Sequence, residues 1–284
     1  MNRGIALLAL VLAACAPAPA DRGAGARPAG IVSLNPCTDA ILTEVADPAQ
    51  IRALSAYSRN PASSSMDVAT AARFTATTGT VEEIAALRPA LVVSGTFTAP
   101  ATRAALARLG IPLVEIPIAG SVEQSLDQVR QLAALTGHPQ RGAALIARIT
   151  AALAQAQPRD GRVVPALVWQ SGGIVPGDQT LIADLLRRTG FANAAAARGL
   201  GQADFLPLEQ VLADPPALIF AAGDRSGEDR MLSHPALARL PSTHRARLDP
   251  ALLWCGGPTI IPAAARLAAV RRQQDAPAPG GSGL

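Results

Sequence analysis

Short apolar runs alternate along the chain with segments in which apolar residues recur every three or four positions. The runs have the length of buried β-strands, and the longer segments have the spacing of amphipathic α-helices. Strands are predicted at Gly30–Leu34, Ile51–Ser55, Leu91–Ser94, Pro112–Ile116, Val163–Trp169, Ala217–Ala221 and Arg245–Leu248. Helices are predicted at Thr38–Ala46, Ala101–Leu109, Val122–Leu135, Arg141–Gln157, Leu181–Arg188, Pro235–Leu240 and Ala263–Arg272. Strands that alternate with helices indicate an α/β fold with mainly parallel sheets.

The clearest helical pattern lies midway along the chain, at Arg141–Gln157. This segment is rich in Ala, and Leu145, Ile149 and Leu153 recur at every fourth position. The order of elements before it begins again after it. We therefore expect two similar lobes joined by one long, rigid helix.

One sequence motif occurs in both halves of the chain. It begins at Glu82 and again 127 residues later at Glu209, with Ile or Val two residues on and Pro-Ala-Leu from the seventh residue on. An apolar run then ends at Gly95 and at Gly223. A match of this kind indicates that one helix-turn-strand unit was built twice, with a carboxylate at the same position in each copy.

The composition excludes several classes of function. Hydrophobic residues make up 49% of the chain and charged residues 16%, as in a globular protein. The 25 basic residues are all Arg, which excludes a Gly-Lys phosphate loop, a Schiff-base lysine and a Ser-x-x-Lys nucleophile. Aromatic residues are only 3% and the Arg residues are scattered, so the pattern lacks the basic, stacking face that binds nucleic acid.

The first residues have the pattern of an export signal. Arg3 precedes a short apolar segment, Ile5–Ala14, that is too short to span a bilayer. Leu12-Ala-Ala-Cys15 has the pattern of a bacterial lipobox, which predicts a periplasmic protein anchored by a lipid on Cys15. Cleavage after Ala20, which would release a soluble protein, is the alternative. The predicted organisation is a leader at 1–20, a tether at 21–29, an N-terminal lobe at 30–139, a connecting helix at 140–158, a C-terminal lobe at 159–274 and a disordered tail at 275–284.

Four segments carry a resemblance to a known family. They are Ile31-Val-Ser-Leu-Asn-Pro36, Thr80-Val-Glu-Glu-Ile-Ala-Ala-Leu-Arg-Pro89, Leu181-Ile-Ala-Asp-Leu-Leu-Arg-Arg-Thr-Gly190 and Leu208-Glu-Gln-Val-Leu212. In this order they resemble the ABC-transporter substrate-binding proteins that carry cobalamin or iron complexes in bacteria. The resemblance implies two three-layer αβα lobes joined by a single long helix, with the ligand cleft between them. It also implies a carrier without catalytic residues or an intrinsic cofactor, whose partners are a permease dimer and its ATPase subunits.

Glu82 and Glu209 match the docking carboxylates of that family, which lie on the outer face of each lobe and meet Arg residues of the permease. The alternative is that each is only a first-turn Glu favoured by the helix dipole. Thr80 and Glu83 have the spacing of a capping box, which gives Glu83 a local partner and leaves Glu82 free. Glu209 has no Ser or Thr cap to serve.

Ligand contacts are expected in the loops that follow the strands, because a cleft between open parallel sheets lies at those ends. The candidates are Asn35, Cys37, Tyr57, Arg59 and Phe97 in the first lobe, and Trp169, Gln170, Arg225, Trp254 and Cys255 in the second. The only Tyr and both Trp residues of the chain are among them, which favours a flat or bulky ligand, although an aromatic residue at a strand end can also serve the core.

Cobalamin is the first candidate ligand, followed by a ferric siderophore and then haem. The cobalamin binders of the family carry a Trp just before the Gly that opens the first docking helix, where this chain has Thr77 and Thr78, so one stacking surface is missing. Arg59 and Arg225 favour the siderophore, because a guanidinium binds anionic oxygens in bidentate geometry.

Cys37 and Cys255 leave three alternatives open. A disulfide suits an oxidising compartment but would tie the lobes together across the cleft entrance. Two thiolates could instead hold a soft metal, or both residues could be buried and inert. No Cys-x-x-Cys pattern or nearby His supports the metal site.

An exported thiol- or metal-dependent hydrolase is the rival class of function. Its candidate residues are Cys37, Cys255, Ser171 and Asp178. The sequence lacks a Gly-x-Ser-x-Gly elbow, a His-Glu-x-x-His motif and a His beside a candidate nucleophile. A third alternative is a binding or sensor protein that works without a permease, which would not need both docking Glu residues.

Overall fold

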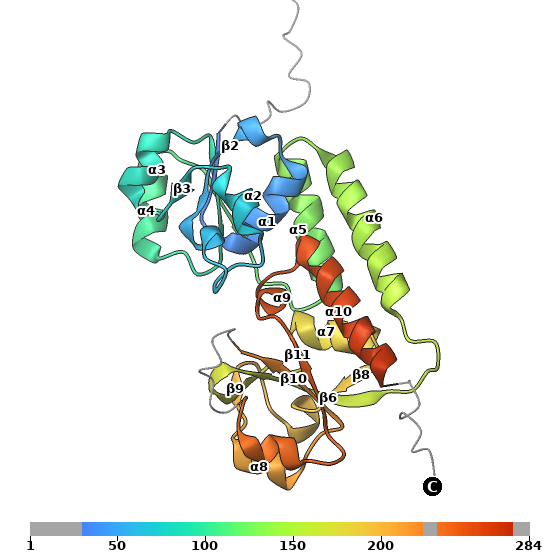
Figure 1. Ribbon diagram of the computed structural model, residues 1–284. Helices are drawn as coiled ribbons and strands as arrows, with labels where there is room; N and C mark the ends of the chain where they lie inside the picture. The colour runs from blue at the N-terminus through green and yellow to red at the C-terminus, as the bar shows by residue number, and fades with distance from the viewer. Residues whose placement is uncertain (1–29, 224–231, 275–284) are drawn as a thin grey trace, which may run out of the picture.

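The structure is a computed structural model that describes residues 30–223 and 232–274, drawn in Figure 1. Two α/β lobes lie one above the other, and the long helix α6 (Pro139–Ala156) runs beside them. The predicted leader, tether and tail, the lipidation site Cys15 and the ligand candidate Arg225 lie outside the described residues. None of the helices in the described ranges is long and apolar enough to cross a membrane.

The N-terminal lobe is built on a five-stranded sheet with the strand order β3-β2-β1-β4-β5, and every pair in it is parallel. The strands are β1 (Ile31–Ser33), β2 (Ile51–Ser55), β3 (Ala76–Thr77), β4 (Leu91–Gly95) and β5 (Leu113–Ile116). The helices are α1 (Pro36–Val45), α2 (Val68–Ala72), α3 (Val81–Leu87), α4 (Pro100–Arg108) and α5 (Val122–Leu135), with short 3-10 turns η1 (Pro48–Gln50) and η2 (Ala56–Arg59).

The C-terminal lobe has a four-stranded parallel sheet with the order β11-β10-β6-β8. Its strands are β6 (Val164–Gln170), β8 (Phe191–Asn193), β10 (Leu218–Ala222) and β11 (His244–Arg247), and a separate antiparallel pair is formed by β7 (Ile174–Val175) and β9 (Asp204–Phe205). The helices are α7 (Leu181–Arg188), α8 (Leu208–Ala213), α9 (Ala251–Trp254) and α10 (Ile260–Gln273), with 3-10 turns η3 (Ser171–Gly173), η4 (Ala196–Arg198), η5 (Pro235–Arg239) and η6 (Gly257–Thr259).

The two sheets are wound in the same way. In each sheet, the strands that come next in the sequence lie on one side of the first strand, and the later strands lie on its other side. The order therefore reverses between the neighbouring strands β1 and β4 in one lobe, and between β6 and β10 in the other. The duplicated motif forms α3 and β4 in the first copy, and α8 and β10 in the second. This confirms the predicted parallel α/β fold and the repeated unit. Since all main-sheet strands are parallel, their carboxyl ends share one edge, where ligands bind in such folds.

The lobes are connected by more than the single helix expected from the sequence. Helices α5 and α10 both pack against α6, so the end of the chain returns to the connecting helix (Figure 1). One buried cluster runs through both lobes, from Val93 in β4 through Ile149 in α6 to Leu267 in α10. The Asp184 carboxylate in α7 also accepts the Val122 N–H that begins α5, at 2.9 Å. The lobes therefore share part of their core.

Helices with a clear apolar period begin and end close to the predicted residues, and α5 and α7 match the prediction. Helix α1 begins at Pro36 rather than Thr38 because the Asn35 side chain caps it and Pro occupies its first position. The predicted helix at Pro235–Leu240 is a 3-10 turn, η5. Strands β3, β7, β8 and β9 were not predicted, because two or three residues are too few to show a period.

Candidate ligand-binding site

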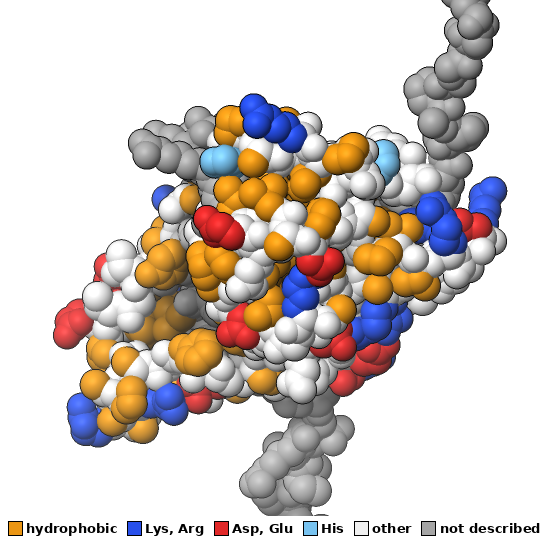
Figure 2. Space-filling model, turned by 90° about the horizontal axis from the view of Figure 1, so that it is seen from below, with side chains coloured by type: hydrophobic (Ala, Val, Ile, Leu, Met, Phe, Trp, Pro, Cys, Tyr) orange, Lys and Arg blue, Asp and Glu red, His pale blue; other side chains and the backbone are white. Residues whose placement is uncertain are grey.

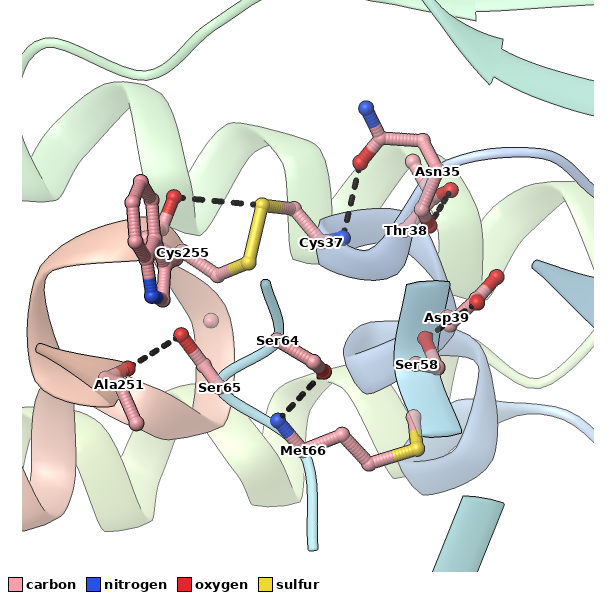
Figure 3. Close-up of a disulfide and its surroundings, with 12 residues drawn as sticks. Asn35, Cys37, Thr38, Asp39, Ser58, Ser64, Ser65, Met66, Ala251 and Cys255 are labelled. Carbon is pink, nitrogen blue, oxygen red and sulfur yellow. Dashed lines mark hydrogen bonds between the residues drawn. A yellow bond between two sulfur atoms is a disulfide. The ribbon is translucent and has the colours of Figure 1, made fainter. Parts of the chain in front are cut away.

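The loops that follow β1, β2 and β11 meet where the two lobes join. Cys37, at the start of α1, forms a disulfide with Cys255, which follows α9, with an S–S distance of 2.15 Å and a Cα–Cα distance of 5.0 Å. Nearby, the Ser65 hydroxyl donates to the Ala251 carbonyl at 2.5 Å (Figure 3). Loops from distant parts of the sequence are thus joined to each other here.

The disulfide decides among the three alternatives for the cysteines. Because both sulfur atoms are bonded to each other, the metal-thiolate alternative and the inert-thiol alternative are wrong. No group of three or more His, Cys, Asp or Glu residues among those described could hold a metal ion. The segment after Cys255 packs against α1, α5 and α6, so the bond lies on the side of the connecting helices rather than across the cleft entrance.

The loop between β1 and α1 has well-defined local hydrogen bonds. The Asn35 carboxamide oxygen accepts the Cys37 N–H at 2.8 Å, and the Thr38 hydroxyl donates to the Asn35 carbonyl at 2.9 Å. A Cβ atom added at Gly95 would lie 2.8 Å from the Asn35 amide nitrogen, so the amide group lies against the end of β4. Asn35 therefore fixes the first turn of α1, and its amide nitrogen lies between the two central strands.

Asp39, in the first turn of α1, is a buried residue that sequence reasoning missed. Its carboxylate accepts the Ser55 N–H at 2.9 Å and the Ser58 hydroxyl at 2.6 Å. Burial raises the pKa of Asp39 to about 7, outweighing the hydrogen bonds from Ser33, Ser58 and Ser55, which lower it. An Asp in a first helical turn is common because the dipole favours it, so its sequence position carried no functional signal.

Large apolar side chains are exposed at the ends of the strands. Tyr57, Phe97 and Trp254 are 63%, 86% and 49% exposed. In the C-terminal lobe, Ile174 and Phe205 are 42% and 54% exposed and lie opposite each other in the β7–β9 pair, on one face. The space-filling view shows a hollow with hydrophobic side chains around it (Figure 2). Exposed apolar side chains of this size are typical of a binding surface.

Ile174 and Phe205 could not be predicted as site residues, because strands of two residues have no period. Gly173 explains how Phe205 is held: it has φ +82°, and a Cβ there would lie 2.5 Å from the Phe205 ring. The ring therefore rests on the backbone of Gly173 and remains exposed on its other side. Gly173 and Phe205 are close in space but far apart in the sequence, so their contact can be seen only in the folded structure.

Trp169 is not a ligand contact, which corrects the prediction. It is fully buried in the core with Val211 and Ile219, and its indole N–H donates to the Leu206 carbonyl at 3.0 Å. The reason is that β6 extends one residue beyond its predicted end, so Trp169 stays within a central strand whose two faces are covered. Gln170, the last residue of β6, is partly exposed at the strand end.

Glu82 and Glu209 are exposed in the first turns of α3 and α8. Among the described residues, neither carboxylate has a hydrogen-bond or ion-pair partner. Figure 1 shows α3 and α8 on the far sides of the two lobes, away from the place where the lobes meet. The neighbouring Glu83 is different, since it binds the Thr77 hydroxyl at 2.7 Å and the Thr78 N–H at 2.8 Å, which lowers its pKa.

The sequence profile of the periplasmic binding protein family matches residues 31–248. The chain belongs to this family. Periplasmic binding proteins of this kind are the substrate-binding components of ABC importers, which work with a permease and an ATPase, and they are not enzymes, so the hydrolase alternative is wrong. No curated protein matches the chain.

Solved structures show the same fold at low sequence identity. A periplasmic heme-binding protein from Pseudomonas aeruginosa is 20% identical with a TM-score of 0.67, over 86% of this chain and 92% of that one. The vitamin B12 binding protein BtuF of Vibrio cholerae is 17% identical with a TM-score of 0.67, over 88% and 99%. The heme-binding protein HutB of Vibrio cholerae is 18% identical with a TM-score of 0.68, over 85% and 98%. This periplasmic binding protein thus shares their two-lobed architecture.

Proposed function

We propose that this periplasmic binding protein captures a bulky metal complex, with cobalamin or a related corrinoid as the first candidate, and delivers it to the permease of an ABC importer. The observation that carries the proposal is the exposed apolar surface at the strand ends of both lobes. Tyr57, Phe97 and Trp254 offer aromatic faces, and Ile174 with Phe205 offers a second apolar wall. A flat macrocycle can cover such walls with both of its faces, and burial of apolar area supplies affinity without a charged partner.

The siderophore alternative is weaker because Arg59, one of the two Arg residues predicted to bind it, already donates a hydrogen bond within the protein. The Arg59 guanidinium donates to the Phe74 carbonyl at 2.5 Å, at the surface of the N-terminal lobe. An anionic iron complex would have to replace that bond. The neighbours that bind heme and vitamin B12 also support a macrocyclic ligand.

An equilibrium titration followed by absorption tests the ligand class. We expect cyanocobalamin to bind at one equivalent, and Tyr57→Ala and Trp254→Ala each to weaken binding by about 10-fold, since loss of one stacked aromatic costs about 1.4 kcal/mol. Trp169→Phe is the matched control and should keep the affinity, because that side chain lies in the core. Haemin and a ferric tris-catecholate are the comparison probes. Saturation by the catecholate alone, or wild-type affinity for cyanocobalamin in both Ala variants, would contradict the proposal.

Delivery is the second part of the proposed function. Glu82 and Glu209 are the docking residues, since each is exposed, without a partner among the described residues, and placed at the same point of a repeated helix-strand unit. Two carboxylates on separate lobes can meet basic groups on two permease subunits at once. Lipidation of Cys15 would keep the protein at the membrane that holds this permease. Intact mass of the mature protein tests that anchor: a diacylglycerol-modified Cys15 is expected, and an unmodified chain that begins at Asp21 would contradict it.

A further inference from the structure

Two neighbouring residues of α1 hold the loops that carry the exposed aromatic side chains. Asp39 holds the loop of Tyr57: the N–H of Ser55 and the hydroxyl of Ser58, which lie on either side of that loop, both donate to one carboxylate oxygen. Tyr57 itself is exposed and lies in the short turn η2. It is 63% exposed, and the hydrogen bonds of Ser55 and Ser58 to Asp39 hold the backbone on either side of it.

Cys37, two residues earlier in the same turn, holds the loop of Trp254. Its disulfide to Cys255 fixes the residue directly after Trp254, and its sulfur lies 3.3 Å from the Trp254 carbonyl oxygen. Figure 3 shows both attachments on α1, with the Asp39 carboxyl group toward Ser58 and the Cys37 sulfur toward Cys255. Helix α9 is a single turn that packs Leu252 and Leu253 against the core, while Trp254 at its end is 49% exposed, so the disulfide at the next residue is the attachment nearest to the indole.

The chain after Cys255 is locked in a different way. Gly257 has φ +59°, a Cβ there would lie 2.6 Å from Ile41 of α1, and its N–H donates to the Ser125 hydroxyl at 2.7 Å. Loss of the disulfide therefore removes the attachment beside Trp254, while Ala251 before it and Gly257 after it stay held. Its effect should be local.

We infer that the first turn of α1 is the positioning element of the ligand site: through Asp39 it fixes Tyr57, through Cys37 it fixes Trp254, and so it sets the spacing of these two aromatic side chains. Asp39 and the disulfide are positioning groups and need not touch the ligand. The expected effect on ligand affinity rests on the proposed function. The expected effect on the positions of Tyr57 and Trp254 rests only on the contacts described above.

Fluorine NMR can test the positioning without any ligand. The chain has one Tyr and two Trp residues, so fluorotyrosine gives one resonance, from Tyr57, and 5-fluorotryptophan gives two, from Trp254 and Trp169. Fully buried Trp169 reports whether the fold is intact. The variants are Asp39→Ala, the conservative Asp39→Asn, and the double variant Cys37→Ser/Cys255→Ser. The disulfide of the wild-type protein can also be reduced with dithiothreitol. Dithiothreitol supplies two electrons and two protons, so that Cys37 and Cys255 become thiols and dithiothreitol becomes a cyclic disulfide.

We expect the double Ser variant and the reduced wild type to move or broaden the Trp254 resonance alone. Asp39→Ala should move the Tyr57 resonance alone, and Asp39→Asn should restore it, because an amide oxygen still accepts both hydrogen bonds. With cyanocobalamin as the probe, each disturbance should weaken binding by about 10-fold. Unchanged resonances, or movement of all three together, would overturn the inference. If cyanocobalamin fails to bind wild type, the proposed function fails while the resonances still decide the positioning role.

Discussion

Asp39 is a carboxyl group whose hydrogen-bond donors are neutral hydroxyl and backbone groups rather than a cation. Burial raises its pKa from 3.8 to about 7, so the folded protein holds this proton over a range in which the unfolded chain has released it. The stability that the neutral carboxyl contributes is present below pH 4 and is lost as the pH rises through 7. The residue that positions Tyr57 thus also links stability to pH.

The resulting prediction concerns the pH profile of unfolding. Between about pH 4 and pH 7 the free energy of unfolding should fall by up to about 1.4 kcal/mol per pH unit through Asp39 alone. Asp39→Asn should lack this part of the slope, since an amide does not titrate. Urea denaturation of both proteins across that range measures the difference. Parallel profiles for the two proteins would show that Asp39 titrates normally in the folded state.

At the residue scale, the sequence predicted part of the site. Tyr57 and Trp254 follow strands whose ends could be located, and both are exposed there. Trp169 was misplaced because a shift of one residue in a strand end decides whether a side chain belongs to the sheet or to the loop. Phe205 was missed because its exposure depends on Gly173, 32 positions away in the sequence, and that contact exists only in the folded chain.

Helices α3 and α8 are the element that the chain uses twice. In each copy the strand that follows is an inner strand of its sheet, and the Glu of the first turn is exposed. The apolar runs and Pro-Ala-Leu turns made this unit visible in the sequence. The sequence also predicted that Glu83, and not Glu82, has a local partner. That partner is different from the one expected, because Glu83 binds Thr77 and Thr78 rather than the backbone N–H of its helix cap.

A pair of substitutions tests the docking role of these helices. Glu82→Ala with Glu209→Ala should lower ligand uptake by cells at least about 10-fold, because both carboxylates that meet the permease are lost. Affinity for the ligand and the melting temperature should stay unchanged. Glu83→Ala is the control: it should lower stability slightly through its lost hydrogen bonds to Thr77 and Thr78 and leave uptake intact. Weaker ligand binding by the Glu82→Ala/Glu209→Ala variant would contradict the docking role.

On the scale of the whole molecule, the two lobes form one body. A shared buried cluster, helix α10 packed on α6, and a disulfide between residues 218 positions apart all connect them. The sequence showed two lobes and one connecting helix, because those features repeat or have a period. The return of α10 and the disulfide depend on contacts between distant segments, which no local pattern encodes.

The long loop closed by the disulfide leads to a prediction for the stability of the whole chain. Cys37→Ser/Cys255→Ser should lower the free energy of unfolding by about 5 kcal/mol, because the unfolded chain gains the entropy of an open loop. Unfolding should still be a single transition, followed by denaturant titration with probes in both lobes. Two separate transitions would show that the lobes unfold independently.

In the proposed function, aromatic and apolar side chains of both lobes hold a bulky metal macrocycle. The most direct measurement is the mass and absorption spectrum of the molecule that copurifies with the protein from its native host. We expect one corrinoid per chain, and we expect it to be absent from Tyr57→Ala/Trp254→Ala protein that is still folded. A copurified ligand without a metal macrocycle, or a corrinoid retained at full occupancy by that variant, would contradict it.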